Sequence, residues 1–159
     1  MVIEKMSKRQ AQVSMARHRK VTKLLQENFP GCDITYDGVE GIDHTVVFNG
    51  KPTYIEVKTC NKIMKKTNKC PQLGRFKFNT AKKYPYTVSQ HDDLVKDDGW
   101  YIFVVASGNQ YSEITGIAAK ELKLGESQSE QRVSWCNVMN QCYPDWLRRL
   151  KIKVYEIQG

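Results

Sequence analysis

The stretch that decides the fold reads Gly41-Ile42-Asp43-His44-Thr45-Val46-Val47-Phe48-Asn49-Gly50-Lys51-Pro52-Thr53-Tyr54-Ile55-Glu56-Val57-Lys58. Two runs rich in β-branched and aromatic residues flank Asn49-Gly50, the strongest short-range signal of a β-hairpin. With a two-residue type I′ turn, Phe48 faces Lys51. The pairing then continues residue by residue until Asp43 lies opposite Glu56, on a rung without backbone hydrogen bonds.

The alternation of side chains along the two strands sorts this stretch into two faces. Asp43, Glu56 and Lys58 share one face. The other face is apolar and is predicted to join the core: Ile42, Val46, Phe48, Ile55 and Val57. Two carboxylates that face each other destabilise a strand pair, so a bound cation, the Lys58 ammonium or protonation of one acid must offset their repulsion.

Asp43 followed by Glu56-Val57-Lys58 across a hairpin resembles the D…(D/E)-x-K signature of the PD-(D/E)XK nuclease superfamily. That group includes restriction enzymes, Holliday-junction resolvases and repair nucleases. The resemblance extends from about Asp43 to Ala106, because Ser89-Gln90 at the head of a helix before Trp100–Ala106 is similar to the segment that follows the motif. It implies a restriction-endonuclease-like fold and a DNA endonuclease of restriction, junction-resolving or repair type.

The resemblance also implies a role for each residue of the motif. Asp43 and Glu56 would bind Mg²⁺, with Mn²⁺ as a substitute, and the backbone carbonyl of Val57 would be a further ligand. Lys58 would orient the attacking water or stabilise developing negative charge, and Gln90 would support the site. Carboxylates suit this chemistry because Mg²⁺ prefers oxygen ligands and phosphodiester hydrolysis needs an activated water and neutralised charge.

The first predicted helix departs from the pattern of the resembled family, in which a Glu on this helix usually supports the metal. The segment from about Ser7 to Phe29 has helical periodicity, yet no acid lies between Lys5 and Gln26. Gln10, Gln12 or His18 could occupy the usual place. Two alternatives therefore stay open: a catalytically inactive nuclease-like DNA-binding module, and a cross-strand salt-bridge cluster on a solvated sheet face.

The charge of the chain indicates a polyanionic partner. The net charge is +8 and the sequence pI is about 9.2. Between Thr59 and His91 there is no acidic residue, whereas eight residues are basic: Lys62, Lys65, Lys66, Lys69, Arg75, Lys77, Lys82 and Lys83. We expect them to contact the phosphates of duplex or branched DNA, with a solvated loop or an RNA partner as the alternatives. Phe76 and Phe78 are expected in the core.

Composition bounds the class of protein. A chain of 159 residues with 40% hydrophobic residues and a mean hydropathy of −0.57 predicts one soluble domain over residues 1–159. No apolar run is long enough for a membrane span, and no secretory segment follows the start. The five cysteines include no C-x-x-C pair, which favours reduced thiols and a cytoplasmic, intracellular location, with nucleoid association as an option. A homodimer would let a small enzyme reach both DNA strands.

The remaining segments complete a mixed α/β prediction, a central β-sheet flanked by helices. Strands are expected at Cys32–Tyr36 and at the continuous apolar run Trp100–Ala106, which is typical of a central buried strand. Helical pieces are expected at Val133–Cys142 and Asp145–Leu150. Residues Lys151–Ile157 alternate as a final strand would.

Overall fold

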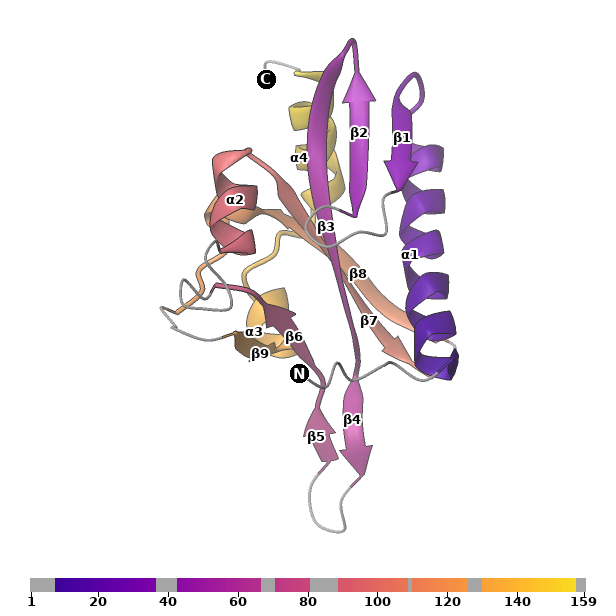
Figure 1. Ribbon diagram of the computed structural model, residues 1–159, viewed down its shortest axis with the longest axis vertical. Coiled ribbons are helices and arrows are strands. Elements are labelled where there is room, and N and C mark those ends of the chain that lie inside the picture. The colour runs from indigo at the N-terminus through magenta and orange to yellow at the C-terminus, as the bar shows by residue number, and fades with distance from the viewer. Residues whose placement is uncertain are drawn as a thin grey trace.

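The computed structural model describes residues 8–36, 43–66, 71–80, 89–108, 110–125 and 130–156 (Figure 1). A five-stranded sheet runs through its centre in the order β1-β2-β3-β7-β8. These strands are β1 (Asp33–Tyr36), β2 (His44–Phe48), β3 (Lys51–Asn61), β7 (Trp100–Ser107) and β8 (Gln110–Ala118). β3 and β7 are parallel and the other neighbours antiparallel, so the predicted mixed α/β sheet is confirmed.

The β2–β3 hairpin has the predicted register. Its pairs run from Phe48↔Lys51 to His44↔Ile55. Asn49 and Gly50 have φ angles of 52° and 74°, and a type I′ turn requires positive φ at both of its central positions.

β3 is much longer than β2, and this difference shapes the site. The pairing with β2 ends at Ile55, whereas β3 continues to Asn61 and pairs with β7 along the whole of this extension. In β3 the N–H and C=O groups that face β2 belong to alternate residues, among them Ile55 and Val57. Beyond Ile55 these groups therefore need other partners.

Helices cover one face of the sheet. α1 (Lys8–Asn28) and α4 (Trp146–Tyr155) pack there. The buried residues of this face include Val21, Leu25, Val46, Ile55, Val57, Trp100, Ile102 and Leu150.

The opposite face carries a second core. It is covered by α2 (Gln90–Lys96), α3 (Trp135–Met139) and a two-stranded sheet of β6 (Arg75–Phe78) and β9 (Gln131–Ser134). Phe76 and Phe78 are fully buried here, as predicted. Trp100–Ala106 is buried on both faces, which accounts for its continuous apolar sequence. The remaining elements are a ribbon of β4 (Ile63–Lys66) and β5 (Pro71–Leu73) and a short 3₁₀ turn, η1 (Ala119–Glu121).

One expectation about secondary structure was wrong and another was confirmed only in part. Of the predicted final strand Lys151–Ile157, residues 151–155 are instead the second half of α4, because Trp146, Leu150 and Val154 recur every four residues and bury one helical face; Ile157 lies outside the described residues. In the predicted helical piece Val133–Cys142, the first two residues belong to β9, which pairs with β6, whereas Trp135–Met139 form α3 as expected. The basic segment after Thr59, for which a solvated loop was the alternative, contains β4, β5 and β6. Across the described residues, the helices are too short or too polar to cross a membrane.

Candidate catalytic site

Asp43, Glu56 and Lys58 come together beside the extension of β3. Their side chains are only 15%, 15% and 18% exposed. The Lys58 Nζ lies 3.7 Å from Glu56 Oε1, and Asp43 is close enough to Glu56 for its negative charge to raise the pKa of that carboxyl group. The three residues that the sequence motif singles out therefore form one cluster of two acids and an ammonium group.

Asp43 occupies the place where β2 stops. Its backbone N–H donates to the carbonyl of Ile55 at 3.2 Å, and its Oδ2 accepts from the N–H of Val57 at 2.8 Å. In a continuing ladder a backbone carbonyl of β2 would accept that N–H, so the Asp43 side chain replaces it. The expected rung of Asp43 facing Glu56 is accordingly corrected: the regular ladder ends one residue earlier, at His44, and the acids meet through a bend.

The carboxyl group of Glu56 has a strongly raised pKa. Burial, together with the negative charge of Asp43 and their hydrogen bond, raises its pKa to about 8, although Lys58 and His18 act in the opposite direction. Its Oε2 is buried and meets no hydrogen-bond donor among the described residues. Near neutral pH this carboxyl group is therefore either protonated or in need of a bound cation that neutralises its charge.

His18 of α1 reaches the same cluster. Its Nε2 lies 3.7 Å from Asp43 Oδ2, and its side chain is 14% exposed. Of the three candidates for the place of the family's Glu, Gln12 is exposed, and the side chain of Gln10 lies outside the described residues. The structure thus places an imidazole of α1 beside Asp43.

The rings of His18, Tyr36 and His44 lie next to one another, and the charge of Asp43 acts to raise the pKa of both Tyr36 and His44. The ring of Tyr36 lies 5.6 Å from that of His18 and 4.9 Å from that of His44. Burial lowers the pKa of His44 to about 4, and its Nε2 lies 2.6 Å from Thr22 Oγ1. His44 is therefore a neutral structural residue near physiological pH.

The start of α2 lies near the cluster and contributes a residue pair that the sequence argument missed. The side chain of Ser89 accepts from the N–H of Asp92, as expected for an N-cap. His91 Nδ1 lies 2.7 Å from the hydroxyl of Tyr101, and their rings are stacked. Tyr101 is the β7 partner of Glu56, and the charge of Lys58 is one of the causes that lower the pKa of His91, after burial.

Some sequence signal for this pair existed. His91 directly follows Gln90, and Tyr101 alternates with Phe103 on the face that Glu56 shares. Gln90 itself begins α2 and is half-buried, but no hydrogen bond within the described part of the chain joins its amide to Asp43, Glu56 or Lys58.

The oxygen atoms at the cluster fit a hard divalent cation. In an extended strand the N–H and C=O of one residue point to the same side, so the Val57 carbonyl faces the side on which Asp43 lies. Two carboxylates and a carbonyl suit Mg²⁺, which commonly uses one or two carboxylates and completes its shell with water and phosphate. Within the described ranges no group of three His, Cys, Asp or Glu side chains is arranged to hold a metal ion, so the carbonyl would have to complete the protein ligands here; Cys32, Cys60, Cys136 and Cys142 are free thiols.

The predicted phosphate-binding residues are only partly described. Lys62, Arg75 and Lys77 are exposed, although Lys77 forms an ion pair of 3.0 Å with Glu130. Lys65 and Lys66 lie in β4, of which the structure describes the backbone. Lys69, Lys82 and Lys83 lie outside the described residues.

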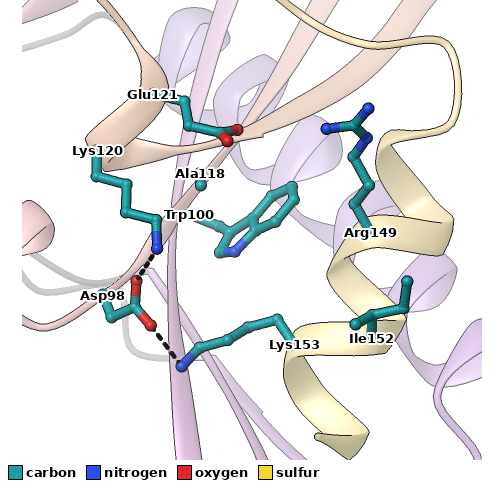
Figure 2. A pocket seen from close by; sticks show the side chains of 8 residues that line it. All are labelled: Asp98, Trp100, Ala118, Lys120, Glu121, Arg149, Ile152 and Lys153. Atoms are coloured by element: carbon teal, nitrogen blue, oxygen red, sulfur yellow. Dashed lines mark ion pairs between the residues drawn. The ribbon is translucent and has the colours of Figure 1, made fainter. Parts of the chain in front are cut away.

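A pocket beside α4 is lined by none of the residues of the acid cluster (Figure 2). It contains Trp100 and three cationic side chains, each of which has an acidic partner. Asp98 pairs with Lys120 at 3.4 Å and with Lys153 at 2.7 Å. Arg149 pairs with Asp145 at 3.0 Å. The two ion pairs of Asp98 join η1 and the turn before β7 to α4, so we assign the pocket a structural role.

Comparison of the chain with models of protein families and with curated proteins finds no match. Fold class alone does not define function. The function is therefore inferred from the geometry of the acid cluster.

Proposed function

We propose that this protein is a divalent-metal-dependent DNA endonuclease with a restriction-endonuclease-like fold. The observation that carries the proposal is the convergence of Asp43, Glu56 and Lys58 where β3 runs past β2. The antiparallel β2–β3 hairpin, followed by α2 and the parallel strand β7, supports the fold assignment. The reaction is hydrolysis of a phosphodiester bond.

Each residue of the cluster has a defined task in this proposal. Asp43, Glu56 and the Val57 carbonyl would hold Mg²⁺ or Mn²⁺, which supplies charge neutralisation and a more acidic water. The Asp43 carboxylate is fixed by the N–H of Val57, so its orientation is set before the cation arrives. The ammonium of Lys58 is held between Glu56 and the ring of Phe78, whose centroid lies 5.6 Å away. From there it orients the attacking water or stabilises charge on the phosphate oxygens.

The raised pKa of Glu56 fits a cation site better than a salt-bridge cluster. A stable ion pair with Lys58 would lower the pKa of the acid, whereas burial and Asp43 together raise it. Binding of a divalent cation would displace the proton and neutralise both acids. The basic segment after Thr59 supports DNA as the substrate, and a homodimer is the arrangement by which one site per chain reaches both strands.

A second function remains open, and one observation favours it. His18 stands beside Asp43 where an acid would strengthen metal binding. A nuclease-like DNA-binding module that no longer cleaves is therefore the alternative. This alternative predicts a DNA affinity that neither Mg²⁺ nor substitution of Glu56 changes.

Cleavage of supercoiled plasmid, a branched junction and single-stranded DNA in Mg²⁺ distinguishes the two functions. We expect nicking by the wild type and loss of nicking in Asp43→Asn, Glu56→Gln and Lys58→Met, with DNA affinity retained or increased. Glu27→Gln is the matched control, because it removes an acid from an exposed surface pair. Nicking by either acid variant at the wild-type rate would contradict the site assignment, and DNA binding without nicking by the wild type would favour the module. An excess of RNA as competitor tests the RNA alternative.

A further inference from the structure

The β4–β5 ribbon extends from the end of β3 and projects beyond the body of the molecule (Figure 1). Its two strands pair with each other in a sheet of their own. β3 is continuous from Glu56 to Asn61, which at about 3.3 Å per residue spans roughly 17 Å. The base of the ribbon thus lies within one turn of duplex, about 34 Å, of the acid cluster.

The base of the ribbon is anchored on both of its strands. The carbonyl of Lys62 accepts from the N–H of Gly74 at 3.1 Å and from the Trp135 indole at 2.9 Å. The N–H of Lys62 donates to Ala106 at 2.8 Å. A Cβ at Gly74 would lie 1.6 Å from the carbonyl oxygen of Asn61, so only glycine fits there. The direction of the ribbon is therefore set by the fold.

One rung of the ribbon exposes two large aliphatic side chains. Ile63 and Leu73 are direct partners, so their side chains share a face. Each is 43% exposed, and neither belongs to the two cores. An isolated two-stranded ribbon gains little stability by itself, and exposed apolar pairs on a projecting element mark surfaces that meet a partner.

The positive charge near this apolar rung favours a polyanionic partner. The sequence from Lys62 to Arg75 contains five basic residues and no acid, and the side chains of Lys62 and Arg75 at the base of the ribbon are exposed. A second copy of the ribbon would bring like charges together, whereas DNA offers phosphates on both sides of a groove. Two-stranded ribbons fit DNA grooves, and aliphatic side chains can wedge between base pairs.

We infer that the β4–β5 ribbon enters a groove of the DNA substrate and places the Ile63–Leu73 rung against sugars and bases. This inference rests on the proposed function for its substrate. The basic flanks contact the phosphates that border the groove. The ribbon thereby sets the distance along the duplex between the groove that it occupies and the phosphodiester bond that lies at Asp43 and Glu56.

The test uses the full chain with Glu56→Gln to prevent cleavage, and a duplex of about three helical turns that contains 2-aminopurine. We expect Ile63→Ser together with Leu73→Ser to weaken binding at least tenfold by fluorescence anisotropy, without changing its salt dependence. The rise in 2-aminopurine fluorescence on binding should disappear as well. Met15→Ser is the matched control, since Met15 is 49% exposed on α1. Lys62→Gln should instead reduce the salt slope by about one.

Several results would overturn the inference. The double variant could bind DNA with unchanged affinity. It could change from dimer to monomer in sedimentation, or lose binding to phosphatidylserine vesicles while it still binds DNA. Failure of the proposed function is separable. If the wild type binds DNA through the ribbon but does not nick it, the inference about the ribbon stands and the nuclease proposal is wrong. If the wild type nicks DNA and the double variant binds and nicks equally well, the nuclease proposal stands and the inference about the ribbon is wrong.

Discussion

The carboxylate of Asp43 accepts a hydrogen bond from the backbone N–H of Val57 at 2.8 Å, at the point where β2 has ended and β3 continues. One side chain thereby serves both the sheet and the candidate site. The same contact directs an acid toward Glu56, whose pKa it helps to raise. Fold stability and site chemistry are therefore coupled at this residue, and substitutions can separate them.

The first prediction compares two substitutions of Asp43. Asn keeps an oxygen that can accept from Val57 and removes the repulsion with Glu56, so Asp43→Asn should be at least as stable as the wild type at pH 8. Asp43→Ala removes the repulsion too but leaves the Val57 N–H without its partner, which should make it about 1–2 kcal/mol less stable than the Asn variant. Urea unfolding measures the difference. Both variants should have lost Mg²⁺-dependent nicking, and equal stability of the two would show that the hydrogen bond contributes nothing.

The hairpin and its register were predictable from sequence, because Asn49-Gly50 permits a type I′ turn and the turn fixes every pair after it. The grouping of Asp43, Glu56 and Lys58 followed from that register. What could not be predicted is where the ladder stops, since this depends on α1 and on the bend at Asp43. Lys151–Ile157 failed for another reason: a short amphipathic segment fits both strand and helix periods, and packing of Trp146 and Leu150 decided for the helix.

The sequence offered His18 only as one of three candidates and gave only a partial signal for the His91–Tyr101 pair. His18 and Asp43 belong to separate elements, and only the packing of α1 brings them within 3.7 Å. Tyr101 lies in an apolar run that predicts burial but gives no partner for its hydroxyl. A residue's distance from the site along the chain carries little information when a sheet brings parallel strands together.

The second prediction concerns pH and Glu56. Its pKa is about 8 in the folded protein and about 4.3 in the unfolded chain. The folded state therefore binds the proton more tightly, and the stability that Glu56 contributes is fully present below pH 4 and is lost as the pH rises through 8. Without metal, we expect the wild type to lose about 1–3 kcal/mol relative to Glu56→Gln between pH 5.5 and pH 9. Paired urea titrations of the two proteins isolate this group, and parallel pH profiles would rule the shift out.

Mg²⁺ should reverse that loss. A cation that replaces the proton binds more tightly as the pH rises, so millimolar Mg²⁺ should raise the Tm of the wild type at pH 9 far more than at pH 5.5. Glu56→Gln and Asp43→Asn should show little response at either pH, and Glu27→Gln should respond like the wild type. A response that is independent of pH would place Mg²⁺ elsewhere on the protein.

The third prediction separates the charge of Lys58 from its packing. Its side chain is 18% exposed, and its ammonium lies near Glu56 and the ring of Phe78. Lys58→Met keeps the aliphatic length against Phe78 and removes the charge. We expect nicking to fall by about a hundredfold or more, while DNA affinity and the cooperative unfolding transition are kept. Since Lys58 lowers the pKa of Glu56, the pH at which Mg²⁺ begins to stabilise this variant should also move upward, which mere loss of packing would not produce.

The fourth prediction concerns a variant that adds an acid to α1. His18 Nε2 lies 3.7 Å from Asp43 Oδ2, so His18→Glu would bring a third carboxylate to the cluster. Without metal the variant should be less stable than the wild type at pH 8, because three acids then share a buried site. With Mg²⁺ the order should reverse, and the Mg²⁺ concentration for half-maximal stabilisation should fall about fivefold or more. His18→Gln, which has similar length and no charge, is the matched control. If His18→Glu and His18→Gln respond alike to Mg²⁺, then α1 does not face the metal, and the imidazole of His18 acts only as a neighbour that orients Asp43.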